Sequence, residues 1–179
     1  SNNKNNFLFD TLLKSFFYLI KFIYKNKSFF LINTLIKKRE ILLIYFKSFK
    51  IPFVYRRLDY KKNRIDLNLR KKIFKDKLYE KNDFLSFFYK NLYLITPKSY
   101  LEDFQNIRKL IHKYYPVGKK NKFFTALNYK KDDLFKIWVA ENSLLKGKYY
   151  ILQHGGNSGI DELTNEADYV KTVADKFLT

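Results

Sequence analysis

The pattern of apolar and polar positions changes character near residue 122. From there to the last residue, short apolar runs alternate with stretches of helical spacing. The apolar runs are 123–127, 149–152 and 176–179, and the helical stretches are 132–145 and 162–174. Strands that alternate with helices are typical of a parallel sheet with right-handed crossovers. The pattern therefore predicts an α/β fold, with a Rossmann-like β-α-β-α-β part over residues 122–179.

Before residue 122 the apolar spacing is mainly helical. The predicted helices cover 7–24, 28–49, 56–77, 83–92 and 99–115, although the apolar run 41–46 fits a buried strand equally well. The segment 56–77 is highly charged, which predicts a solvated helix that carries Leu67, Ile73 and Leu78 inward. We therefore divide the chain into a helix-rich amino-terminal region, 1–121, and the Rossmann-like part, 122–179.

Both ends of the chain predict a fragment of a longer protein. The first residue is Ser1, and the sequence contains no Met. The last residues form an apolar run that ends at Thr179 with no polar tail after it. We expect the chain to be truncated at both ends.

The amino-terminal helix predicted over 7–24 has an unusually wide apolar surface. It contains no stretch of 18 uncharged apolar residues, because Asp10, Lys14 and Lys21 interrupt it, so it is a poor membrane span. Two interpretations remain open. The helix is buried in a larger protein, which we favour, or it lies in a membrane interface.

The formal charge of +19 invites a nucleic-acid interpretation, because clustered Lys neutralises phosphates. However, Lys is over-used together with Asn, Phe, Ile, Tyr and Leu, which is expected when AT-rich codons dominate a genome. The basic residues are also spread along residues 4–148 instead of forming one block. We favour compositional bias over a nucleic-acid site. A mildly basic surface that faces anionic lipid or a nucleotide-linked substrate is an intermediate alternative.

The absence of Cys removes disulfides, thiolate catalysis and zinc ribbons. The natural compartment is then the cytoplasm. The sequence contains no metal-ligand spacing, no Walker-type loop and no GxGxxG motif. We expect no metal and no bound cofactor, and nucleotide binding cannot be derived from a motif.

The best candidate for chemistry is Gln153-His154-Gly155-Gly156, which follows the apolar run 149–152. Ligands of open parallel sheets bind beyond the carboxyl ends of the strands. His154 can exchange a proton near neutral pH, the two glycines allow backbone N–H groups to approach an anion, and Gln153 can bond a sugar hydroxyl. The alternative is that His154 only ends a strand and the glycines form an ordinary loop.

Two other residues that invite a functional role have simpler explanations. Trp138 lies in helical register with Leu134 and Ile137, so core packing is favoured over stacking on a sugar. His112, which lies within a predicted helix, is expected to be a surface residue without a role.

Four stretches resemble a bacterial family of surface-carbohydrate-biosynthesis transferases. They are Phe135-Lys136-Ile137-Trp138-Val139-Ala140-Glu141, Lys146-Gly147-Lys148, Gln153-His154-Gly155-Gly156 and Ala174-Asp175-Lys176-Phe177-Leu178-Thr179. In that family the pattern is approximately a Phe-Lys-x-Trp-x-Ala-Glu helix, a Gly, a strand, Gln-His-Gly-Gly, and Ser-Asp-x-Phe-Leu before Trp-Gly-Trp. The segment 97–101 is also similar. The resemblance covers about residues 60–179 and is most specific in the last third.

The resemblance implies part of a two-domain GT-B glycosyltransferase fold, similar also to teichoic-acid glycerophosphotransferases and capsule sugar transferases. It implies that His154 is catalytic, as a general base on the acceptor or a donor to the departing phosphate. Gln153, Gly155 and Gly156 would bind substrate. Glu162 and Glu166 are further candidates for orienting His154 or binding a sugar hydroxyl, and a solvated helix face is the alternative for both. The implied partners are a nucleotide-sugar donor and a glycan acceptor.

The chain departs from the family pattern in two places. The family usually carries His and Glu before the Asp of the last strand, where this chain has Tyr169 and Val170. The chain also stops before Trp-Gly-Trp, so the second nucleotide-binding domain is expected to be missing and the fragment alone to be inactive.

Two rival functions remain. One is a basic, aromatic-rich module that stacks its rings on nucleic-acid bases. The other is a membrane-interface protein that acts through residues 7–46, so peripheral contact with a membrane stays among the expected partners. Buried aromatic side chains would favour the enzyme, whereas an exposed aromatic stripe flanked by Lys would favour binding.

Overall fold

A computed structural model describes residues 15, 18–19, 21–24, 26–74, 83–153 and 165–178, with the backbone alone at 83, 89–90 and 165–167. The chain forms two compact units. The first combines Ser1–Leu58 with Leu110–Thr179, and the second is Asp59–Lys109.

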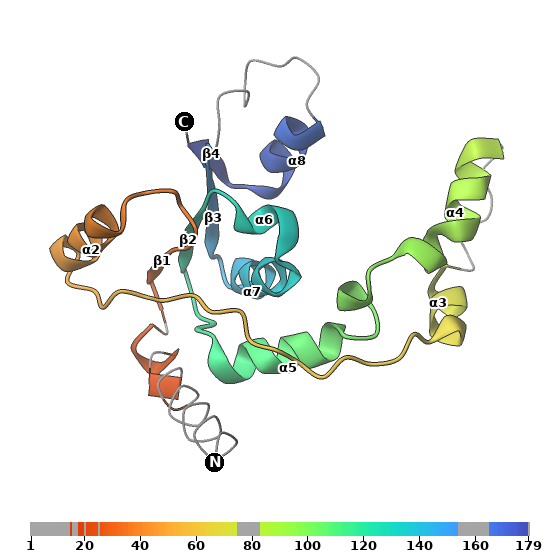
Figure 1. The fold of residues 1–179 in the computed structure, drawn as a ribbon, viewed down its shortest axis with the longest axis horizontal. Helices are drawn as coiled ribbons and strands as arrows, with labels where there is room; N and C mark the ends of the chain where they lie inside the picture. The colour runs from red at the N-terminus through yellow and green to blue at the C-terminus, as the bar shows by residue number, and fades with distance from the viewer. Residues whose placement is uncertain are drawn as a thin grey trace, which may run out of the picture. The chain divides into compact units, whose positions relative to one another are not determined.

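The first unit is built on a four-stranded parallel sheet, which confirms the predicted α/β class. Its strands are β1 (Phe29–Leu31), β2 (Lys122–Thr125), β3 (Lys148–Leu152) and β4 (Lys176–Leu178). They lie in the order β1-β2-β3-β4, and every neighbouring pair is parallel (Figure 1). The three apolar runs after residue 122 thus pair as adjacent strands, as predicted, and the fold is Rossmann-like.

The strand β1 was not predicted, because helical spacing was assigned to 28–49 in the helix-rich region. Phe30 pairs with Phe123 of β2, which is far away in sequence. A strand of only three residues is stabilised mainly by the neighbouring strand. The local pattern of apolar residues therefore does not predict it. Within the same segment, the ambiguous run 41–46 is helical and belongs to α2 (Lys38–Lys47).

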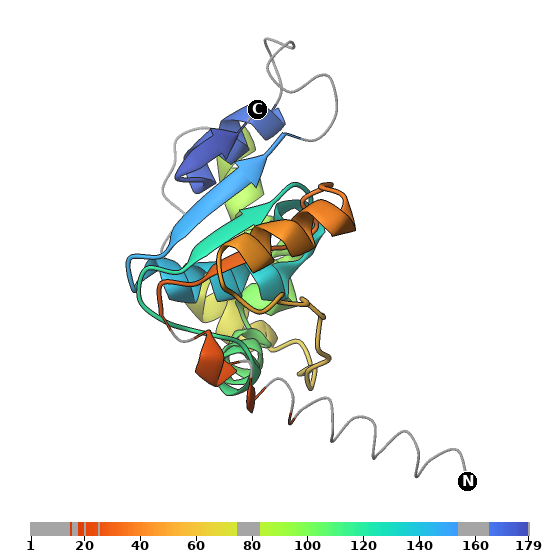
Figure 2. The ribbon, with the colours of Figure 1, turned by 90° about the vertical axis from the view of Figure 1, so that its left-hand side faces the viewer.

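Helices cover the two faces of the sheet unequally (Figures 1 and 2). On one face lie α6 (Asn128–Lys131), α7 (Asp133–Ser143) and α8 (Asn165–Val173). On the other lies α2, which is the element nearest the viewer in Figure 2. The crossovers β2-α7-β3 and β3-α8-β4 confirm the two helices expected between the carboxyl-terminal strands.

The boundaries of α7 follow from its sequence. Asp132 is its N-cap and accepts a hydrogen bond from the backbone N of Phe135 at 3.1 Å. At the other end, the N–H of Gly147 bonds the carbonyl of Asn142 at 2.9 Å. A Cβ on Gly147 would lie 2.7 Å from that same carbonyl oxygen, so only glycine allows the chain to turn this tightly into β3.

Aromatic side chains form the core between the sheet and α7. Trp138 is fully buried, and its Nε1 donates to the carbonyl of Pro116 at 2.8 Å. Its aromatic neighbours are Phe30, Phe53, Tyr55, Tyr115, Phe123 and Phe135. The prediction that Trp138 packs in the core is confirmed.

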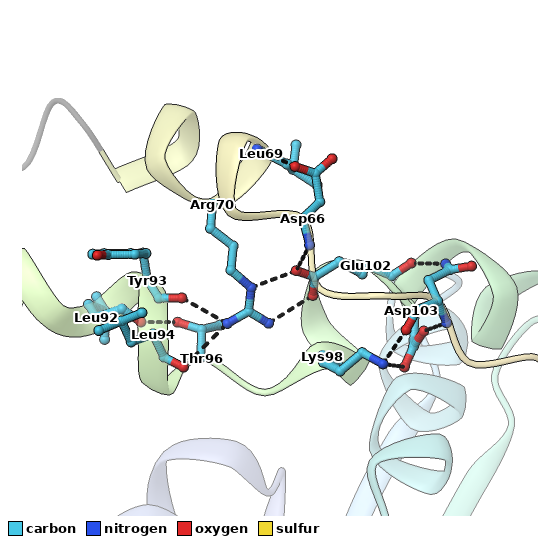
Figure 3. Close-up of polar contacts among 11 residues, drawn as sticks. Asp66, Leu69, Arg70, Leu92, Tyr93, Leu94, Thr96, Lys98, Glu102 and Asp103 are labelled. Atoms are coloured by element: carbon cyan, nitrogen blue, oxygen red, sulfur yellow. Dashed lines mark hydrogen bonds and ion pairs between the residues drawn. The ribbon is translucent and has the colours of Figure 1, made fainter.

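The second unit contains α3 (Leu67–Phe74), α4 (Asp83–Ile95) and the short 3-10 helix η2 (Lys98–Tyr100), and α5 (Phe104–Tyr114) begins in it. The orientation predicted for α3 is wrong. Leu67 and Ile73 are about half exposed, whereas Arg70 is buried and paired with Glu102 (Figure 3). Leu78 lies outside the described residues. In the part of the chain that the structure describes, no helix is both long and apolar enough to cross a membrane.

Candidate functional site at the carboxyl edge of the sheet

The carboxyl ends of all four strands meet at one edge, because the sheet is entirely parallel. The chain leaves this edge at Ile32-Asn33 after β1, at Ala126 after β2 and at Gln153 after β3. Ligands of open parallel sheets bind at this edge. The residues that follow each strand are therefore the candidates for a site.

Gln153 is the predicted substrate-binding residue that the structure describes most fully. It is half-buried and directly follows β3. Its backbone N–H donates to the carbonyl of Leu178 at 2.8 Å, which extends the β3–β4 ladder by one step. The chain thus passes from the carboxyl edge straight into the residues that carry the predicted catalytic group.

The remaining predicted site residues lie wholly or partly outside the described residues. His154, Gly155, Gly156 and Glu162 are among those that the structure does not describe. Glu166 lies in α8, of which only the backbone is described at that position. Their roles stay predictions.

Polar side chains that were not singled out from the sequence lie at the ends of β1 and β2. The Oγ1 of Thr125 accepts hydrogen bonds from the backbone N–H groups of Leu127 and Asn128, at 3.4 and 3.2 Å. Asn33 joins the two strand ends, because its Nδ2 donates to the Oδ1 of Asn128 and its carbonyl accepts from the N–H of Ala126 at 3.1 Å. Asn33 also adopts a left-handed backbone conformation, with φ of 46°.

Two buried polar atoms at this edge have no hydrogen-bond partner among the described residues. They are the Nδ2 of Asn128 and the Oγ1 of Thr34, in residues that are only 5% and 4% exposed. A buried polar group without a partner costs about 1–3 kcal/mol. Such groups are candidates for bonding a ligand, and Asn128 offers an N–H donor.

Part of this edge was detectable from the sequence. Asn128 follows the predicted strand 123–127 as Gln153 follows 149–152, so the rule that singled out Gln153 applied to Asn128 as well, whereas Thr125 is the last residue of β2. Asn33 was not detectable, because β1 itself was not expected.

A groove of about 470 Å³ opens beside the carboxyl end of β1. Its walls come from β1, α2 and the extended segment 52–55. Most of the lining is apolar, as at Ile41 and Phe53, and the polar contributions include the side chains of Asn33 and Lys38. A groove of this composition fits an apolar group better than a sugar.

The carboxylate of Asp132, also near this edge, is already engaged. It caps α7, and its Oδ2 accepts a hydrogen bond from the hydroxyl of Tyr55 at 2.7 Å. Burial, followed by the charge of Asp132, raises the pKa of Tyr55 above its ordinary value. Both groups are held in a structural contact, so neither is a candidate for proton transfer.

The described histidine, His112, lies away from the carboxyl edge. Its Nε2 is 2.6 Å from the Oε2 of Glu141, which is buried near the carboxyl end of α7. Since α7 runs antiparallel to the strands, that end returns to the amino edge of the sheet. The imidazole is 47% exposed, in line with the expected surface position, and the contact ties α5 to α7.

The described residues contain no cluster of three or more His, Cys, Asp or Glu side chains that could hold a metal ion. The chemistry that can be assigned to the described edge is hydrogen bonding by Gln153, Asn33 and Asn128, next to an apolar groove.

Comparison with known proteins gives one match. The model of the LIC12162 family transferase matches residues 1–179, which is the whole chain. No curated protein and no solved structure matches the chain. Because the family model matches the whole chain given, the chain belongs to the LIC12162 family of transferases.

Proposed function

We propose that this transferase is of the glycosyltransferase type. In this proposal it moves an activated sugar, or a related phospho-alditol unit, from a nucleotide donor to a surface-glycan acceptor in the bacterial cytoplasm. The observation that carries the proposal is the exit of the chain from β3 through Gln153 at the carboxyl edge, directly before His154-Gly155-Gly156. The family match supports the transfer of a group, and the resemblance in the last third of the chain supports the sugar.

The proposed reaction needs one group that exchanges a proton and several that bind the donor. His154 takes the proton of the acceptor hydroxyl as the new bond to the transferred unit forms and the bond to the departing phosphate breaks. The backbone N–H groups of Gly155 and Gly156 bind the charge that develops on that phosphate. Gln153 bonds a hydroxyl of the transferred unit. Asn128 adds a buried N–H donor at the neighbouring strand end.

The position of the aromatic side chains supports an enzyme over a nucleic-acid module in the α/β part. Trp138, Phe123 and Phe135 are buried in one cluster. Rings that stack on bases must be exposed. The exposed rings of this part are dispersed over α8, β4 and α2, as at Tyr169, Phe177 and Phe46.

The experiment uses the complete gene product, because GT-B enzymes bind their substrates in a cleft between two domains. A panel of nucleoside-diphosphate and nucleoside-monophosphate sugars is tested for nucleotide release, first without and then with membrane extract as the source of acceptor. Removing a general acid or base typically lowers the rate about 10²–10⁴-fold. We expect that loss for His154→Ala, with the thermal midpoint unchanged.

Two variants sharpen the result. His154→Gln keeps a hydrogen-bond donor but cannot take a proton, so activity that survives in it but not in His154→Ala would make His154 a positioning residue. His112→Gln is the matched control, because it keeps a donor beside Glu141 and lies away from the carboxyl edge. Full activity in both His154 variants would contradict the proposed mechanism.

A further inference from the structure

The outer face of α2 combines exposed apolar and basic side chains. Tyr45 is buried against the sheet, where its ring stacks on Phe29 at 4.9 Å. With 3.6 residues per turn, the face opposite Tyr45 carries Arg39, Glu40, Leu43 and Lys47, with Phe46 at its edge. We call these five residues, together with Phe49 and Lys50 of the following turn, the α2 surface.

The apolar members of the α2 surface project into solvent. Leu43 is 46% exposed, Phe46 79% and Phe49 97%. Phe49 follows the helix in a left-handed conformation, with φ of 52°, which is uncommon for a bulky residue. The turn is closed by a hydrogen bond from the N–H of Lys50 to the carbonyl of Tyr45 at 3.0 Å. The backbone therefore holds this ring out into solvent.

The charge around the α2 surface is mainly positive. Residues 31–57 contain a single acidic residue, Glu40. The basic residues of the same stretch are Lys37, Lys38, Arg39, Lys47, Lys50, Arg56 and Arg57. Apolar surface also continues beside it, because the exposed side chains of Leu42 and Val54 line the groove next to β1.

We propose that the α2 surface docks the protein on the surface of an anionic lipid bilayer. Aromatic and aliphatic side chains enter the boundary between headgroups and acyl chains, while Lys and Arg stay at the level of the lipid phosphates. The centre of a protein–protein interface is normally depleted in Lys, whereas here Lys47 lies between Phe46 and Phe49. Charge complementarity and this mixture of side chains favour lipid over a protein partner.

The test is co-sedimentation of the whole chain with two kinds of vesicle, phosphatidylcholine alone and phosphatidylcholine with about 30% phosphatidylglycerol. We expect binding to the anionic vesicles, and weaker binding as NaCl rises from about 0.05 to 0.5 M, because salt screens the charges. Each basic residue near such a surface contributes about fivefold to partition. Lys47→Glu with Lys50→Glu should therefore weaken binding by at least about 25-fold.

Matched control variants distinguish binding through the α2 surface from non-specific binding to vesicles. Leu43→Ser should weaken partition about tenfold. The same change at Leu144, which is 77% exposed beyond α7 on the opposite face of the sheet, should leave it unchanged. Lys131→Glu in α6 is the corresponding control for charge. Circular dichroism checks that each variant keeps the fold.

Three results would overturn the proposal. The first is equal binding to neutral and anionic vesicles, and the second is equal losses in the α2 variants and their controls. The third is the absence of vesicle binding while Leu43→Ser or Phe46→Ser abolishes self-association or binding to single-stranded RNA. In that case a second protein copy or a nucleic acid would be the occupant of the surface.

Discussion

Arg70 and Glu102 form a bidentate ion pair that is almost closed to solvent. The Nε of Arg70 lies 2.5 Å from Oε1 of Glu102, and its Nη2 lies 2.8 Å from Oε2 (Figure 3). The two side chains are 2% and 3% exposed. Arg70 Nη1 also donates to the carbonyl of Tyr93 at 2.8 Å, and Glu102 Oε1 accepts from the N–H of Asp66 at 3.1 Å. One guanidinium thereby joins α3, the end of α4 and the turn after η2.

Arg70→Met should destabilise the second unit strongly. Removing one member of a buried pair leaves the other charge without compensation and typically costs about 4 kcal/mol. Arg70→Met combined with Glu102→Leu should recover a large part of that loss, because no buried charge remains. Hydrogen exchange of amides in α3 and α4 measures the effect within the unit. Equal protection in wild type and Arg70→Met would contradict a stabilising role for the pair.

The same pair predicts a pH dependence. The hydrogen bonds from Arg70 lower the pKa of Glu102 to about 2. Because the folded-state pKa is depressed, the unfolded chain binds the proton first as the pH falls. The stabilising contribution is then complete above the ordinary Glu pKa of about 4.3, and it is lost between there and about pH 2. The gap in hydrogen-exchange protection between wild type and Glu102→Gln should be constant from pH 7 to 5 and should narrow below that. If the difference in protection does not change with pH, the charge of Glu102 is not the cause of the effect of Glu102→Gln.

The stability of the protein should respond differently to the same substitution at two buried threonines of the carboxyl edge. Thr125→Val removes the acceptor of two backbone N–H groups and should cost about 1–3 kcal/mol. Thr34→Val removes a hydroxyl without a partner among the described residues, so stability should be unchanged or slightly higher. Denaturant unfolding of both variants makes the comparison. A similar loss in both would show that the Thr34 hydroxyl already bonds another part of the protein.

Gly147→Ala should destabilise the turn between α7 and β3. The new Cβ would meet backbone atoms at 2.7 and 2.9 Å on Asn142 and at 3.1 Å on Asn121, and backbone cannot move aside as a flexible side chain can. Overpacking of this kind typically costs about 1–3 kcal/mol. Ser143→Ala, at an exposed position one turn earlier, is the control and should stay close to wild type. A thermal midpoint of Gly147→Ala equal to that of the control would contradict the close approach.

Local sequence was sufficient for much of the α/β part. The apolar runs that became β2, β3 and β4 are bounded by clear helix signals, such as the cap at Asp132 and the stop at Gly147. Because short helical crossovers join consecutive strands, their parallel pairing followed from the order of elements. Of the candidate site, Gln153 was placed at the carboxyl edge by the same argument, whereas His154 stays a prediction beyond the described residues.

Tertiary structure decided what depends on partners far away in sequence. Phe29–Leu31 is a strand because β2 offers a free ladder edge, and Asn33 joins the site edge only because β1 exists. Arg70 is buried, although the sequence of its helix predicts a solvated one. Its burial is possible because Glu102 and the carbonyl of Tyr93 accept hydrogen bonds from its guanidinium. A charge is buried only when its partners are in place, and those partners come from other elements of the fold. Periodicity along one helix contains no information about them.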